Sequence, residues 1–148
     1  MDVARGLARA LKENFSGPIA IVRDTRESGP EILQALSTGL GEAAVDYGVL
    51  PTPALSAILE QSEGAVGLAI TASHNPWQDN GLKVLGTGGK KLSPDTEAQL
   101  DREIDRCMAL DALAPQVKAA SGEQVYLQAQ LHALGDLESY RGLKIAVD

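Results

Sequence analysis

Cysteine and aromatic residues are scarce in this sequence of 148 residues. Its one cysteine, Cys107, excludes an internal disulfide, and apolar neighbours at helical spacing indicate a buried side chain rather than a nucleophile. No apolar run approaches the length that crosses a membrane, and no signal-peptide pattern is present. We therefore expect no membrane partner and predict a cytoplasmic location.

Basic residues are also few. Thirteen Lys and Arg stand against 20 Asp and Glu, which gives a formal net charge of −7. Because the phosphates of a nucleic acid would be repelled, we expect no nucleic-acid partner. A small phosphosugar is not excluded, since a local cluster can bind an anion on an acidic protein.

Short apolar runs alternate with helical patterns along the chain. The runs that predict strands are 19–22, 45–49, 65–70, 82–85 and 141–148, and the helical patterns are 2–13, 28–40, 53–61, 94–108 and 123–134. The turn Asp79-Asn80-Gly81 lets the strand 82–85 return after the strand 65–70. This order predicts an α/β fold: a three-layer α/β/α domain with a mixed, mostly parallel sheet.

Two helix starts carry capping signals. Ser28 and Glu31 form a capping-box pattern, and Thr52 is the expected N-cap before Pro53. The glycine-rich stretch 86–91 lacks the spacing of a Walker A motif, so we interpret it as a flexible hairpin turn with two solvated lysines.

A polar cluster follows the predicted strand 65–70. At its end, where ligands gather in open α/β sheets, lie Thr71, Ser73, His74 and Asn75, and Lys83 lies on the returning strand. A serine hydroxyl can carry a phosphoryl group covalently, while a histidine and a lysine offer a titratable group and a fixed cation. The alternative is structural: Ser and Asn suit turns, His74 faces solvent and Lys83 occupies the polar face of a strand.

Two arginines follow the predicted strand 19–22. Arg23 and Arg26 could hold an anion near the strand ends. Alternatively, they form local salt bridges with Asp24 and Glu27.

Three segments together resemble the α-D-phosphohexomutase superfamily, which contains phosphoglucomutases, phosphomannomutases and phosphoglucosamine mutases. They are 22–29 (VRDTRESG), 48–54 (GVLPTPA) and 71–83 (TASHNPWQDNGLK). The resemblance implies that Ser73 is the phosphorylated serine, His74 a neighbouring catalytic residue and Lys83 the active-site lysine. It also implies that the phosphate on Ser73 supplies one oxygen ligand to Mg²⁺.

The reaction implied by the resemblance is an intramolecular phosphoryl transfer between hexose 1-phosphate and hexose 6-phosphate. It runs through the phosphoserine, with a hexose 1,6-bisphosphate as intermediate and activator. Residues 1–122 would be domain I with a truncated N-terminus, and residues 123–148 the linker helix and first strand of domain II. No Asp-x-Asp-x-Asp metal loop is present, so we expect the remaining domains of the parent chain to be required and this chain to be inactive alone.

Other functions stay open. A non-catalytic sugar-phosphate-binding or regulatory domain would keep the fold without phosphorylating Ser73. A serine hydrolase is less consistent, because Ser73 lacks the flanking glycines of a nucleophile elbow. The sequence does not decide between glucose, mannose and glucosamine, nor the proton-transfer roles of His74 and Lys83.

Overall fold

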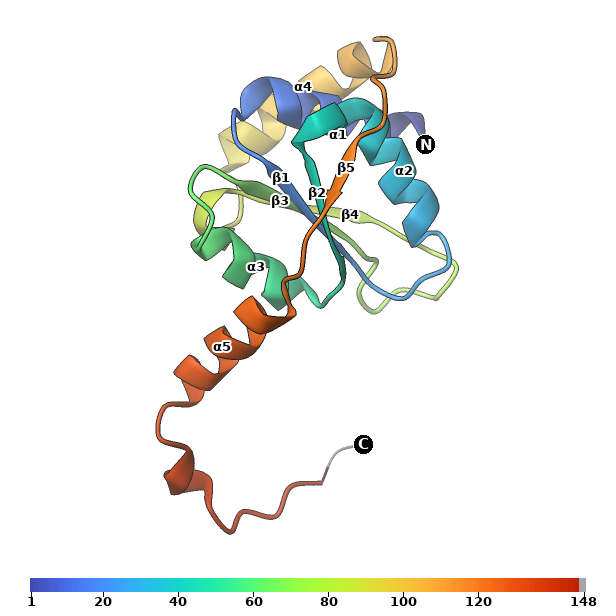
Figure 1. Ribbon diagram of the computed structural model, residues 1–148. Helices are drawn as coiled ribbons and strands as arrows, with labels where there is room; N and C mark the ends of the chain where they lie inside the picture. Colours follow the sequence, from blue (N-terminus) through green and yellow to red (C-terminus); the bar gives the residue numbers. More distant parts are fainter. Residues whose placement is uncertain (147–148) are drawn as a thin grey trace.

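A five-stranded sheet between two helical layers forms the body of the protein (Figure 1). The computed structural model describes residues 1–146. The helices are α1 (Asp2–Asn14), α2 (Gly29–Leu40), α3 (Thr52–Glu60), α4 (Pro94–Met108) and α5 (Glu123–Leu134), with short 3₁₀ turns η1 (Gly41–Ala43), η2 (Thr87–Gly89) and η3 (Leu137–Tyr140). The strands are β1 (Ile19–Arg23), β2 (Ala44–Val49), β3 (Val66–Ile70), β4 (Leu82–Leu85) and β5 (Val117–Ala119).

The strand order is β4-β3-β1-β2-β5. β1 runs parallel to β2 and β3, β5 runs parallel to β2, and β4 is antiparallel to β3. The predicted three-layer domain with a mixed, mostly parallel sheet is therefore confirmed.

The two faces of the sheet bury side chains of different size. Ile19 and Ile21 of β1 pack with α1 and α2, whereas Ala20 packs on the opposite face with α3. At Gly67 a Cβ atom would lie 2.8 Å from Leu55 Cδ1, which is closer than side chains tolerate. Small residues on this face thus let α3 approach the sheet closely.

α1 packs against both α2 and α4. Its approach to α2 requires Gly39, because a Cβ atom there would lie 2.4 Å from the carbonyl oxygen of Arg5 and 2.7 Å from Ala8 Cβ. Cys107 of α4 is 1% exposed, which confirms its assignment as a buried helical side chain.

The structure corrects several local predictions. Ser28 precedes α2, but its hydroxyl accepts a hydrogen bond from the Asn80 side chain (2.9 Å) instead of capping the helix. α3 begins at Thr52 with Pro51 as N-cap, one residue earlier than predicted. The stretch 86–91 contains η2, which packs on α3 and β3 and is therefore not a free hairpin turn. β5 was missed because its three residues are exposed and too short to show a pattern.

Beyond the sheet, α5 contacts α3 and leads to a segment that extends away from the body (Figure 1). The strand predicted over residues 141–148 is not formed at positions 141–146, and its last two residues lie outside the described part. A strand needs a partner to pair with, and the sheet offers it none at that distance. The proposed start of domain II stays a prediction.

None of the helices in residues 1–146 is long and apolar enough to cross a membrane.

Candidate functional site

The site begins where two parallel strands end together. Arg23 of β1 is in register with Ile70 of β3, and the next residue, Asp24, donates its N–H to the carbonyl oxygen of Ile70 (3.1 Å). Asp24 and Thr71 are thereby adjacent, and the Thr71 hydroxyl donates to Asp24 Oδ2 (2.7 Å). As predicted for an open α/β sheet, polar groups gather at this edge.

The loop between β3 and β4 presents Ser73 in an unusual backbone conformation. Within residues 1–146, Ser73 is the one non-glycine residue with a positive φ, 52°. Its N–H donates to Thr71 Oγ1 (3.0 Å), and the loop is closed by the Thr71 N–H, which donates to the carbonyl oxygen of Gly81 (3.0 Å). A side chain in this region strains the backbone, and such strain persists only where the surroundings impose it.

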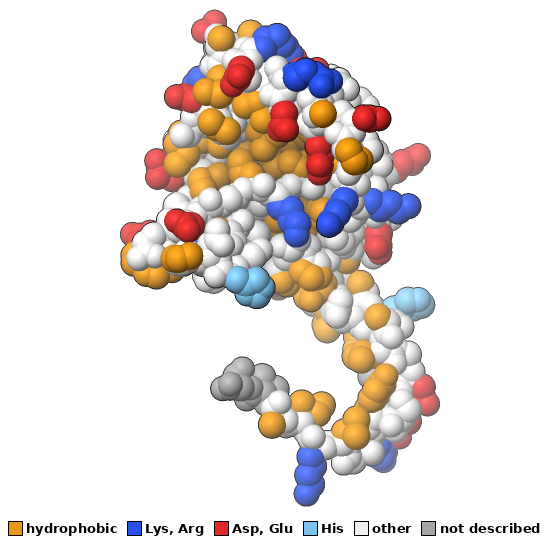
Figure 2. Space-filling view, turned by 180° about the vertical axis from the view of Figure 1, so that it is seen from behind, with side chains coloured by type: hydrophobic (Ala, Val, Ile, Leu, Met, Phe, Trp, Pro, Cys, Tyr) orange, Lys and Arg blue, Asp and Glu red, His pale blue; other side chains and the backbone are white. Residues whose placement is uncertain are grey.

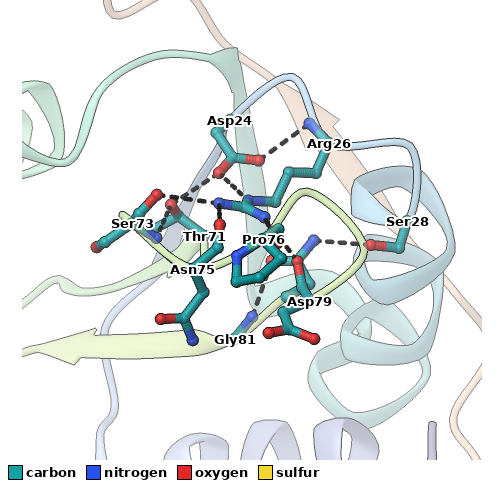
Figure 3. Close-up of polar contacts among 10 residues, drawn as sticks. Asp24, Arg26, Ser28, Thr71, Ser73, Asn75, Pro76, Asp79 and Gly81 are labelled. Carbon is teal, nitrogen blue, oxygen red and sulfur yellow. Dashed lines mark hydrogen bonds and ion pairs between the residues drawn. The ribbon is translucent and has the colours of Figure 1, made fainter.

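Arg26 lies against the inside of this loop (Figure 3). Its side chain is 11% exposed. Each of its five N–H groups donates to a protein oxygen: Nε to Asp24 Oδ2 (2.9 Å), Nη1 to the carbonyls of Pro76 (2.6 Å) and Asp79 (2.9 Å), and Nη2 to the carbonyls of Ser73 (3.0 Å) and Asn75 (3.1 Å).

Asp24 joins the loop to β1. Burial raises the pKa of its carboxyl, but hydrogen bonds from Thr71 and from the backbone and side chain of Arg26 outweigh burial and hold the pKa below its ordinary value. Asp24 is thus a carboxylate at neutral pH and balances the guanidinium of Arg26.

A pocket of about 490 Å³ opens beside the loop. Ser73 and His74 line it together with Arg23, Asp24 and the residues 50–53 that lead into α3. Ser73 and His74 are both exposed, so the structure brings the predicted carrier and its neighbour to one accessible surface.

The other candidate residues lie in different surroundings. Arg23 lines the pocket but pairs with Asp46 of β2 (2.5 Å), not with Asp24 or Glu27. Arg26 forms the predicted salt bridge with Asp24. A direct phosphate contact by Arg26 stays a prediction and would require one of its five hydrogen bonds to break. Asn75 contributes its backbone carbonyl to the loop, and its side chain is exposed.

Lys83 does not line this pocket. It pairs with Ala69 in the β3–β4 ladder, one residue before the strand end, and its side chain is exposed. It lines a different groove, of about 430 Å³, with Leu82, Leu92 and Leu100. Figure 2 shows this apolar hollow, bordered by charged side chains, on the face where the edge strand β4 lies.

The described residues do not form a metal site by themselves. Across positions 1–146, no group of three or more His, Cys, Asp or Glu side chains is placed to hold an ion. A phosphate on Ser73 would add oxygen ligands, but Mg²⁺ takes six, so further donors from outside these residues would be needed.

Sequence reasoning predicted the salt bridge of Asp24 with Arg26, but it missed the hydrogen bond from Thr71 to Asp24 and both hydrogen bonds of the Asn80 side chain. Asn80 Oδ1 accepts the N–H of Gly81 (2.8 Å), while its amide group donates to Ser28. The contact between Asp24 and Thr71 could have been predicted from their positions in the sequence. Each follows a buried strand, and residues that follow parallel strands meet at one edge of the sheet.

The fold and the loop define a class: an α/β/α domain that presents a strained, exposed serine at the carboxyl edge of its parallel strands. Residues 1–110 match the family described as phosphoglucomutase/phosphomannomutase, alpha/beta/alpha domain I. The chain belongs to this family, within the α-D-phosphohexomutase superfamily, and corresponds to its first domain.

Individual relatives support the same family assignment. The chain is similar to a phosphoglucosamine mutase of Deinococcus deserti (38% identity over 88% of this chain and 30% of the relative) and to one of Pseudoalteromonas atlantica (33% identity over 100% and 34%). Among solved structures it resembles a phosphoglucomutase/phosphomannomutase family protein from Burkholderia thailandensis (TM-score 0.66, 28% identity, 86% of this chain and 31% of that one). The chain thus spans about a third of the length of these proteins.

Proposed function

We propose that this domain carries the phosphate in a phosphohexomutase, on the hydroxyl of Ser73. The observation that supports it most directly is the strained, exposed conformation of Ser73 beside a pocket at the carboxyl edge of the sheet. Backbone strain of this kind is concentrated at functional sites, which supports a catalytic role for this serine.

In the proposed reaction, the bond between phosphorus and the Ser73 oxygen breaks while a hydroxyl of a hexose monophosphate forms a new bond to phosphorus. The hexose hydroxyl loses a proton, the Ser73 oxygen that leaves phosphorus takes one up to become a hydroxyl again, and a hexose 1,6-bisphosphate results. The intermediate then turns around and returns its other phosphate to Ser73. The protein contributes mainly position and charge, as phosphoryl transfer generally requires.

His74 is the titratable group beside Ser73 in the pocket, so we assign it a proton-transfer role. Lys83 would contact the transferring phosphate only if its flexible side chain extended from the groove beside β4 to the Ser73 pocket, or if the substrate occupied both the groove and the pocket. Mg²⁺ would take one oxygen from the phosphate on Ser73 and its other ligands from residues beyond this domain, and would neutralise the charge on the transferring group.

We propose glucosamine phosphate as the first substrate to test, because the relatives above are phosphoglucosamine mutases. The assay compares glucosamine, glucose and mannose phosphates with the full-length protein that carries these residues. Intact-mass analysis should find one phosphate on the protein, absent from Ser73→Ala, and turnover should fall to background in that variant.

We expect the 148-residue chain alone to show no turnover, since relatives are about three times as long. Full activity of the Ser73→Ala enzyme would refute the phosphoserine. A protein that binds hexose phosphates without turnover or phosphorylation would instead be a binding or regulatory domain.

A further inference from the structure

One largely shielded guanidinium, that of Arg26, organises the loop that carries Ser73. Arg26 lies 47 to 53 residues before the loop residues that it contacts, yet four carbonyl oxygens of the loop point toward it (Figure 3). A loop that turns its carbonyls inward needs donors there, because unpaired carbonyls shielded from water are unfavourable. Since the guanidinium is planar and has five donors in fixed directions, it can serve all four carbonyls and Asp24 at once.

The same network fixes both peptide groups that flank Ser73. On one side, the N–H of Ser73 donates to Thr71 Oγ1, and that hydroxyl in turn donates to Asp24. On the other side, the carbonyl of Ser73 accepts from Arg26, whose Nε is bound to the same oxygen of Asp24. With both peptide planes held, the backbone torsions of Ser73 are fixed in the left-handed region, and the direction of its side chain follows.

We propose that Arg26 is a positioning residue for phosphoryl transfer, an inference that rests on the function proposed above for Ser73. Arg26 acts through the backbone: it aims the Ser73 hydroxyl and its phosphate into the pocket without itself contacting the sugar. A displacement of about 1 Å of a reacting group can lower the rate by about 100-fold. Loss of the network should therefore reduce kcat, while KM for the hexose phosphate stays unchanged.

The test compares Arg26→Lys, which keeps the charge but has three donors at one point, with a control that changes an arginine outside the network. Arg106→Lys is matched, because Arg106 Nη2 also pairs with a carboxylate, that of Glu13 (2.6 Å), on the α1–α4 surface. In the full-length enzyme, we expect kcat to fall by about 100-fold in Arg26→Lys with KM unchanged, and neither to change in Arg106→Lys.

Hydrogen exchange of the 148-residue chain gives an independent readout. The amides of Ser73 and Asp79 should exchange faster in Arg26→Lys, while the amides of β1 and β3 keep their protection. A normal kcat, or unchanged protection of the loop, would overturn the proposal. A raised KM with normal kcat would also overturn it, since Arg26 would then bind substrate directly.

A second pair of variants keeps Arg26 in place, in case its replacement prevents folding. Thr71→Val removes the hydroxyl that links Ser73 to Asp24, and Thr71→Ser retains it. The proposal requires a loss of kcat in the first and its rescue in the second; equal kcat in both would contradict it. Ser73→Ala separates the two hypotheses: turnover in that variant refutes the phosphoserine, whereas the exchange experiment still decides whether Arg26 orders the loop.

Discussion

The positive φ of Ser73 makes a quantitative prediction about stability. A residue with a Cβ atom costs about 1–2 kcal/mol in the left-handed region, and glycine avoids this cost. Glycine in turn loses about 0.4–1 kcal/mol through the greater freedom of the unfolded chain. Because Ser73→Gly and Ser73→Ala both lack the hydroxyl, the difference between them isolates the backbone. We expect Ser73→Gly to be more stable than Ser73→Ala by about 0.5–1 kcal/mol.

The assay is urea unfolding of the 148-residue chain followed by circular dichroism, with the two variants and the wild type measured side by side. A difference of this size corresponds to about 1–4 °C in Tm. Neither variant should support phosphorylation, so the more stable protein would be an inactive one. If Ser73→Ala proved equal to or more stable than Ser73→Gly, the loop would not hold position 73 in the strained conformation, and the reasoning from strain to function would fail.

Three further predictions concern the scaffold. Gly39→Ala should lower the free energy of unfolding by about 1–3 kcal/mol in denaturant titrations, because the added Cβ atom meets the backbone of α1. Gly29→Ala is the control and should change the free energy of unfolding little, because a Cβ atom there would lie 3.4 Å from its nearest neighbour, Arg23 Cδ. Folding lowers the pKa of Asp24, so the ionised carboxylate stabilises the folded chain above the pKa of the unfolded state, about 4. This stabilisation is lost as pH falls through the lower pKa of the folded state. Measurements of the free energy of unfolding between neutral and acid pH should show the loss in the wild type and not in Asp24→Asn. Burial raises the pKa of the Cys107 thiol, so a disulfide-exchange reagent should label it only after unfolding, and rapid labelling of the native chain would show that α4 opens readily.

The sequence predicted most of the sheet and its flanking helices. Ala65 to Ile70 and Ile19 to Val22 were recognisable as strands buried on both faces, since uninterrupted apolar runs between turn signals are typical of parallel strands. β5 was not recognisable, because its three exposed residues owe their extended backbone to pairing with β2. The predicted capping role of Ser28 was wrong for a related reason. Its sequence context matches a helix N-cap, but its hydroxyl accepts a hydrogen bond from Asn80, a residue distant in sequence.

For the site, local sequence determined that Ser73 and His74 follow a buried strand, within turns that leave them exposed. It could not determine which of two arginines would serve the loop. From the sequence, Arg23 and Arg26 are equally plausible partners of Asp24. In the structure, Arg23 pairs with Asp46 of β2, whereas Arg26 pairs with Asp24 and contacts the loop.

By itself, then, the sequence specified the elements, the layers and an accessible serine at a strand end, because each follows from the alternation of apolar and polar residues and from short-range turn chemistry. Only the tertiary structure decided that the torsions of Ser73 are imposed by Arg26 and Asp24. The register of β1 against β3 brings together groups that lie 47 residues apart, and only then do the carbonyls of the loop find a common donor.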